Sequence, residues 1–113
     1  MASGSGPHRE KTLQSKFARD PEMSELVRTF VEELPERVQQ LQAAFDDAQL
    51  ADLRLLAQRL SGSSDGHGFA PLSTAARQVA DRVAGLKPEA ADKDLRRLET
   101  EVNDLIALCE RVR

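Results

Sequence analysis

Few side chains of this 113-residue chain could take part in covalent chemistry. His67 is the one histidine outside the first ten residues, Cys109 is the single cysteine, and Ser63 and Ser64 are adjacent hydroxyls. The two serines have no nearby histidine base with an orienting acid, so they do not form the pattern of a hydrolytic triad. The histidines and the cysteine also lack the spacing of metal ligands. We therefore predict a protein that is not an enzyme and uses no metal and no cofactor.

The composition predicts a single domain without a membrane span or a nucleic-acid partner. Apolar residues make up 40% of the chain, with no Trp and no Tyr, so the core should consist mostly of Leu, Val and Ala. The net charge is −3 and the basic residues are spread along the chain, whereas phosphate backbones attract a basic face. No apolar run approaches the roughly 18 residues of a membrane span. The lone cysteine and the absence of an apolar secretory segment favour a cytoplasmic location.

The beginning of the chain divides into a tail and a short docking element. Residues 1–10 are small and polar, and they cannot bury enough surface to offset their ordering, so we expect a flexible tail. Residues 11–113 should form one domain. Its first element is predicted over Lys11–Arg19, where Leu13 and Phe17 are four residues apart and could face the domain from a short helix.

Four longer segments show the 3–4-residue spacing of amphipathic helices. The first is expected from about residue 21 to 47, with Asp20 as the cap, Pro21 at the first helical position and a kink at Pro35. The others are expected at about 49–64, from near 71 to 85, and from near 92 to 112. The predicted inward positions are Met23, Leu26, Val27, Phe30, Val31, Leu34, Val38, Leu41, Phe45, Leu50, Leu53, Leu56, Ala57, Leu60, Ser64, Leu72, Ala75, Ala76, Val79, Val83, Leu86, Leu95, Leu98, Val102, Leu105, Ile106, Cys109 and Val112.

Short Gly- and Pro-containing breaks join these segments, which favours antiparallel neighbours. The predicted fold is therefore all-α: a monomeric, antiparallel, up-down-up-down four-helix bundle with a short N-terminal helix.

The outer face of the 49–64 segment is unusual for a solvated helix. At about 100° per residue, the positions opposite its inward stripe are small or apolar rather than charged. They are Ala51, Leu55, Gln58 and Gly62, flanked by Arg54, Ser61 and Asp65. A mid-helix glycine costs about 1 kcal/mol relative to alanine. Either Gly62 allows a partner to approach closely, or Gly62 and Leu55 are incidental near the end of a helix.

The stretch Leu56–Ser64, LAQRLSGSS, closely resembles the L-A-H-x-L-K-G-S motif of histidine-containing phosphotransfer (HPt) domains. The D-P-E helix start, the L-P-E-R kink and the G-x-G-F turn at residues 66–69 are similar to HPt features as well. In that family the histidine carries a phosphoryl group between receiver domains, and the lysine helps to balance its charge. Here Gln58 stands at the histidine position and Ser61 at the lysine position. A carboxamide lacks the nucleophilic nitrogen of imidazole.

The resemblance implies a two-component phosphorelay module that binds the receiver domain of a response regulator or of a hybrid histidine kinase. Because Gln58 replaces the histidine, we expect binding without acceptance of phosphate. The implied partner-binding residues are Ala51, Arg54, Leu55, Gln58, Arg59, Ser61, Gly62 and Asp65. The HPt-like turn also places Phe69 and Leu72 as a plug at one end of the bundle.

Several alternatives remain open at the level of sequence. Gln58 could reflect natural loss, which the second departure at Ser61 favours, a designed replacement of histidine, or an ordinary exposed helix residue. The domain could instead be an active phosphotransfer protein, with histidine natively at position 58 or with His67 as substitute, although His67 follows about two turns later in a loop. A purely structural or oligomerisation bundle is a third function.

Overall fold

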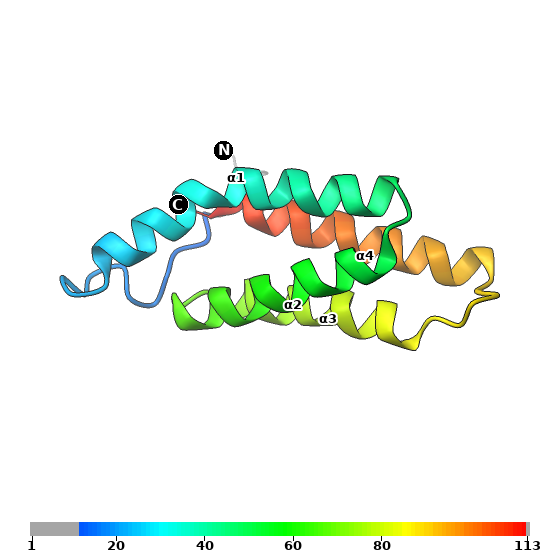
Figure 1. Cartoon of the computed structure of the whole chain (residues 1–113). Helices are drawn as coiled ribbons and strands as arrows, with labels where there is room; N and C mark the ends of the chain where they lie inside the picture. Colours follow the sequence, from blue (N-terminus) through cyan, green and yellow to red (C-terminus); the bar gives the residue numbers. More distant parts are fainter. Residues whose placement is uncertain (1–11, 113) are drawn as a thin grey trace, which may run out of the picture.

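The computed structural model describes residues 12–112, which form four helices joined by short connections. The helices are α1 (Ser24–Asp46), α2 (Leu50–Gly66), α3 (Ala70–Gly85) and α4 (Asp92–Arg111). Helix α2 packs on α1 and α3, and α4 packs on the same two helices, which closes the bundle. Successive helices run in opposite directions, so the predicted antiparallel up-down-up-down bundle is confirmed (Figure 1). The predicted tail at residues 1–10 lies outside the described residues.

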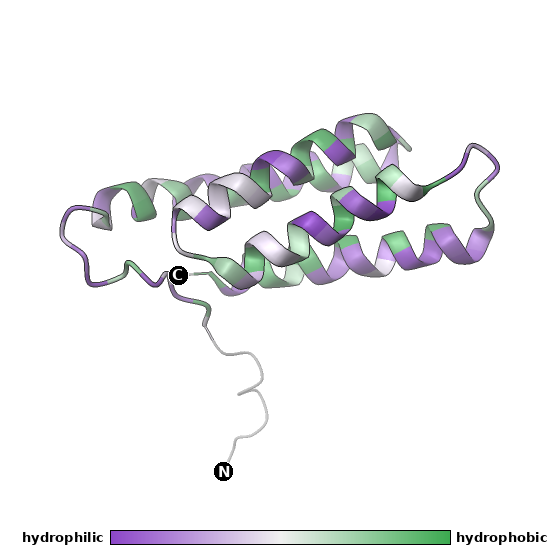
Figure 2. Ribbon diagram, turned by 90° about the horizontal axis from the view of Figure 1, so that it is seen from below, coloured by the Kyte–Doolittle hydropathy of each residue, from purple (hydrophilic) through white to green (hydrophobic). Residues whose placement is uncertain are grey.

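The core is built from aliphatic residues of all four helices, with Phe30 and Phe69 as its buried aromatics. Apolar residues recur along each helix and leave polar residues on the outward faces, as Figure 2 shows. Phe69 and Leu72 are fully buried, which confirms the predicted plug at the α2–α3 end. Helices α2 and α3 bury several small residues, among which Ser61 contacts Ser73 directly; they are Ala57, Ser61 and Ser64 on α2, and Ser73, Ala76 and Ala80 on α3. Small side chains let these two helices approach each other closely.

Helix α1 continues through Pro35 and changes direction along its length (Figure 1). Proline removes one backbone hydrogen bond and its ring crowds the preceding turn, which is the expected cause of a bend. Leu34 and Leu41, on either side of Pro35, are both buried. The residues before and after the bend therefore both contribute to the core.

The predicted short helix at Lys11–Arg19 is wrong for the residues described, Thr12 onward. Leu13 donates its N–H to the Arg111 carbonyl at 2.7 Å, and Lys16 donates to the Gly68 carbonyl at 3.0 Å. These backbone groups thus pair with the end of α4 and with the α2–α3 turn rather than with each other. A helix of only two turns is marginal by itself, so tertiary partners decide its conformation. Leu13 and Phe17 still pack against the core, as their spacing predicted.

The prediction that α1 begins at Pro21 is also wrong, because the helix begins at Ser24. Asp20 does act as a local acceptor: its Oδ1 takes the N–H of Glu22 at 2.9 Å, and its carbonyl takes the N–H of Met23 at 3.0 Å. These bonds form a turn ahead of the helix instead of a helix cap.

Two predicted core positions lie at the surface. Leu26 on α1 is 54% exposed and Leu95 on α4 is 39% exposed. Both lie at the edge of the apolar stripe of their helix, and the buried positions of that stripe include Val27 on α1 and Leu98 on α4. Helical spacing predicts the centre of a stripe well, but the neighbouring helices determine how wide the covered stripe is.

Candidate functional site

The outward face of α2 carries the predicted partner surface. Its exposed residues, called the outer strip below, are Ala51, Arg54, Leu55, Gln58, Gly62 and Asp65. They lie within a narrow angular range at about 100° per residue, opposite the buried stripe of Leu53, Ala57 and Leu60. Leu55 is 44% exposed and is the one large apolar side chain of the strip. The structure therefore brings six of the eight predicted residues onto one continuous face.

Gln58 occupies the middle of the outer strip and is exposed. Its carboxamide makes no hydrogen bond within residues 12–112. The side chain offers two N–H donors and one carbonyl acceptor, but no nucleophilic nitrogen. The group is thus free to bind a partner, and it can do so only by hydrogen bonding.

Ser61 does not belong to the outer strip, which corrects its predicted place in the partner surface. It is 7% exposed, and its Oγ donates to the Ser73 carbonyl at 3.0 Å and lies 3.1 Å from the Ser73 Oγ. The physical reason is its angular position: Ser61 is about 60° from Gln58, on the side that faces α3. Its hydroxyl therefore serves the α2–α3 interface and supplies no charge to the surface around Gln58.

Gly62 is exposed one turn beyond Gln58, within α2. A Cβ built at this position meets no heavy atom within 4 Å, and the backbone is not in the left-handed region that requires glycine. Neither packing nor backbone conformation thus explains a glycine here. The missing side chain leaves a flat surface beside Gln58.

Two guanidinium groups lie near Gln58. Arg54 lies one turn before Gln58, and Arg59 follows it directly, at the edge of the strip that faces α1. Within residues 12–112, neither takes part in an ion pair, whereas Arg28, Arg37 and Arg82 each contact a glutamate. The nearest formal charges to Gln58 along the helix are therefore positive.

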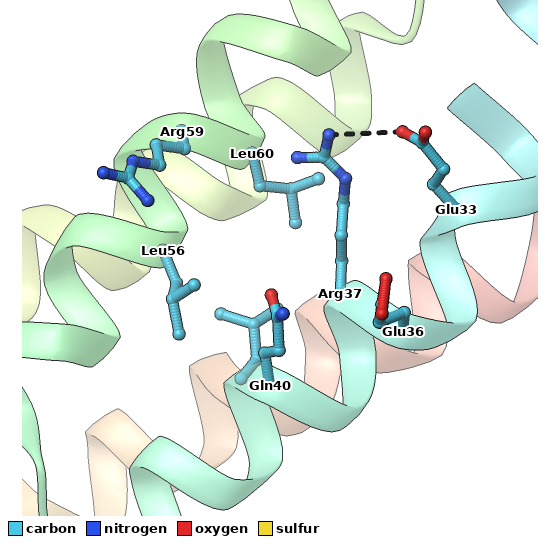
Figure 3. A pocket seen from close by; sticks show the side chains of 8 residues that line it. Glu33, Glu36, Arg37, Gln40, Leu56, Arg59 and Leu60 are labelled. Carbon is cyan, nitrogen blue, oxygen red and sulfur yellow. Dashed lines mark ion pairs between the residues drawn. The ribbon is translucent and has the colours of Figure 1, made fainter. Parts of the chain in front are cut away.

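A groove between α1 and α2 borders the outer strip. It has a volume of about 350 Å³ and is lined by Glu33, Glu36, Arg37, Gln40, Leu41, Leu56, Arg59 and Leu60. Figure 3 shows Arg59 at the α2 rim, directed away from Arg37, whose Nη2 lies 3.6 Å from Oε1 of Glu33. A second hollow continues from it past Leu55 and shares Gln40, Leu56 and Arg59. The sequence did not indicate this groove, since no local pattern shows which polar α1 residues face α2.

His67 is not the free loop histidine that the sequence indicated. It directly follows α2, and its ring stacks on Phe30 with centroids 4.8 Å apart. Its Nδ1 lies 2.7 Å from the Ser63 carbonyl, and its own carbonyl accepts the hydroxyl of Ser15. The ring thus helps to close the end of the bundle, and one of its nitrogens already has a backbone partner.

Cys109 is buried in the core, as predicted from its place on the inward stripe. Burial raises the pKa of its thiol to about 12, so the thiolate that would react is not populated near neutral pH.

Within the described part of the chain, no group of three or more His, Cys, Asp and Glu could hold a metal ion. The helices of residues 12–112 include none that is long and apolar enough to cross a membrane.

An antiparallel four-helix bundle whose second helix carries the stretch LAQRLSGSS is the architecture expected of an Hpt-type phosphorelay module. The Hpt domain family matches residues 25–111, from the first turn of α1 to the last residue of α4. The chain therefore belongs to the Hpt domain family. Hpt domains are phosphotransfer modules of phosphorelays that interact with receiver domains of response regulators, and they act as carriers rather than as classical enzymes. No curated protein and no solved structure matches this chain.

Proposed function

We propose that this domain binds the receiver domain of a response regulator, or of a hybrid histidine kinase, through the outer strip and does not accept its phosphoryl group. Membership in the Hpt domain family supports the choice of partner. Gln58 at the phosphoacceptor position supports the loss of transfer, because a carboxamide cannot form the nitrogen–phosphorus bond that an imidazole forms. In a cytoplasmic phosphorelay, such a domain would compete with an active phosphotransfer protein or sequester a regulator.

The observation that carries this proposal is Gly62. The residue weakens α2 by about 1 kcal/mol relative to alanine, and neither packing nor backbone conformation requires it. A surface that must admit another protein close to Gln58 does explain the missing side chain. Exposed Leu55 on the same face adds the apolar anchor that usually carries much of the energy of an interface.

Docking is tested by titrating purified receiver domains from the source organism against the protein in a calorimeter. Leu55→Asp and Gly62→Gln should weaken binding at least about tenfold, since the first adds a charge to an apolar contact and the second fills the flat surface. The matched controls are Leu95→Asp and Gly85→Gln, which make the same changes at exposed positions outside the outer strip. If the strip variants bind like the parent, while circular dichroism shows all four folded, the outer strip is not the docking surface.

The loss of transfer is tested with a receiver phosphorylated by a small-molecule phosphodonor. The parent should acquire no acid-labile phosphate, whereas Gln58→His measures whether the scaffold still positions a nucleophile. Label on the parent that disappears in His67→Ala would contradict the proposal and would identify His67 as the acceptor. The stacking of His67 on Phe30, together with the contact between its Nδ1 and the Ser63 carbonyl, argues against that outcome.

A further inference from the structure

The surface around Gln58 combines hydrogen-bond donors with positive charge that has no ion-pair partner among residues 12–112. The Gln58 carboxamide has two N–H groups without partners among residues 12–112. Arg54 lies one turn earlier on the same face, exposed and without an ion pair in that range. Donors and cations on one exposed face match the chemistry of a phosphoryl group, which offers several acceptor oxygens and negative charge.

The acidic residues of the region lie farther from Gln58 or on other sides. Asp65 is seven residues later, about 10 Å along the helix axis. Asp52 is on the side of α2 that faces α1, where it lines a hollow with Gln49 and Leu55. Glu33 and Glu36 lie across the groove on α1, and Glu33 is held near Arg37. The local balance of charge next to Gln58 is therefore positive, even though the whole chain is acidic.

Position 58 is the place where a transferring member of the family presents its nucleophile. An imidazole there attacks phosphorus, so that a nitrogen–phosphorus bond forms while the bond to the receiver's aspartate oxygen breaks. A carboxamide at the same place cannot attack, but it can donate hydrogen bonds to the phosphoryl oxygens. The replacement thus converts a group that removes the phosphoryl into a group that can recognise it.

We propose that Gln58, assisted by Arg54, recognises the aspartyl phosphate of a docked receiver, so that this domain binds the phosphorylated receiver in preference to the unphosphorylated one. This inference rests on the proposed docking function and adds the phosphorylation state to which the domain responds. The domain would then hold phosphorylated regulator without discharging it.

The experiment compares each purified receiver domain with and without beryllofluoride, a stable mimic of the phosphoryl group. Binding to the beryllofluoride form should be roughly tenfold tighter, the size expected for one hydrogen bond to a charged group. Gln58→Leu, which keeps the bulk and removes the donors, should abolish the difference in affinity between the two receiver forms, whatever it does to the affinity for the free receiver. Arg54→Gln should reduce the preference, and the control Arg97→Gln on α4 should not.

The outcomes separate this inference from the docking proposal. Equal affinity for both receiver forms overturns phosphoryl recognition and leaves docking intact, whereas no binding of either form overturns both. A preference that survives in Gln58→Leu shows that the domain senses the changed shape of the receiver, and it also overturns the inference.

Two further arms address the source and the fate of the phosphoryl group. Inorganic phosphate is titrated alone, up to about 100 times the receiver's dissociation constant, and should not perturb the NMR signals of the Gln58 side-chain amide. If inorganic phosphate binds as tightly as the receiver does, the surface is a free-anion site and the inference is overturned. The half-life of the receiver's own phosphate should be unchanged or longer with saturating parent domain. A shortened half-life would overturn the proposal that the group is held.

Discussion

The outer strip and the turn that follows α2 each contain a glycine, and the two glycines meet opposite surroundings. A Cβ at Gly62 would meet nothing within 4 Å. A Cβ at Gly68 would lie 2.5 Å from the Ser15 Oγ and 2.9 Å from the Phe17 ring, and its φ of +86° is itself unfavourable for other residues. The fold requires Gly68, whereas it only tolerates Gly62. A glycine that the fold does not need is the better indication of a partner.

The largest expected effect is a loss of stability from changes at the turn that follows α2, where the fold requires its residues. Phe69 is fully buried at the end of the bundle and lies 5.5 Å from Phe30 between ring centroids. Phe69→Ala should lower the free energy of unfolding by about 3–5 kcal/mol, because it removes a large apolar side chain and leaves a cavity. Urea denaturation followed by circular dichroism measures this. A loss below about 1 kcal/mol would show that the plug contributes little.

Gly68→Ala should come next, with a loss of about 1–3 kcal/mol from backbone strain and from the clash with Ser15 and Phe17. Gly85→Ala is the matched control, since its added methyl group meets nothing within 4 Å. The same denaturation experiment compares the two variants with the parent. If both behave alike, the distinction between required and tolerated glycines fails.

Leu55→Asp tests the outer strip. Its side chain is 44% exposed and opposite the core, so the change should alter the free energy of unfolding by less than about 0.5 kcal/mol. Its effect on receiver binding should nevertheless be large, about 1.4 kcal/mol or more, equivalent to tenfold in affinity. Thermal denaturation and calorimetric titration of the same sample measure both quantities. A marked drop in melting temperature would mean that Leu55 supports the bundle.

The smallest effect is expected for Gly62→Ala, which should stabilise the domain by about 0.5–1 kcal/mol through helix propensity. The added methyl group enters open space, so no packing penalty offsets the gain. Thermal denaturation should show a small rise in melting temperature relative to the parent. Any destabilisation would show that the fold does need this glycine, and it would remove the main support for a docking surface.

The helices and the motif were predictable because their signals are local. Apolar spacing located the four helices, and the residues of Leu56–Ser64 indicated the family that the comparison confirmed. The placement of Gln58 at the phosphoacceptor position is a prediction from the sequence motif, whereas the lack of a nucleophilic nitrogen follows from the carboxamide itself. The role of the outer strip in docking remains a prediction.

The burial of individual polar residues and the conformation of the segment before α1 depended on tertiary contacts, which the sequence of one segment cannot encode by itself. Ser61 is buried because α3 brings Ser73 within hydrogen-bonding distance of it. His67 is stacked because the packing of α1 brings Phe30 beside it. The segment before α1 is not a helix, because Leu13 donates its N–H to the Arg111 carbonyl at the end of α4, almost the full length of the chain away. Sequence periodicity determines which face of each helix is apolar, and only the packing of the helices determines which polar residues at the edge of that face are covered.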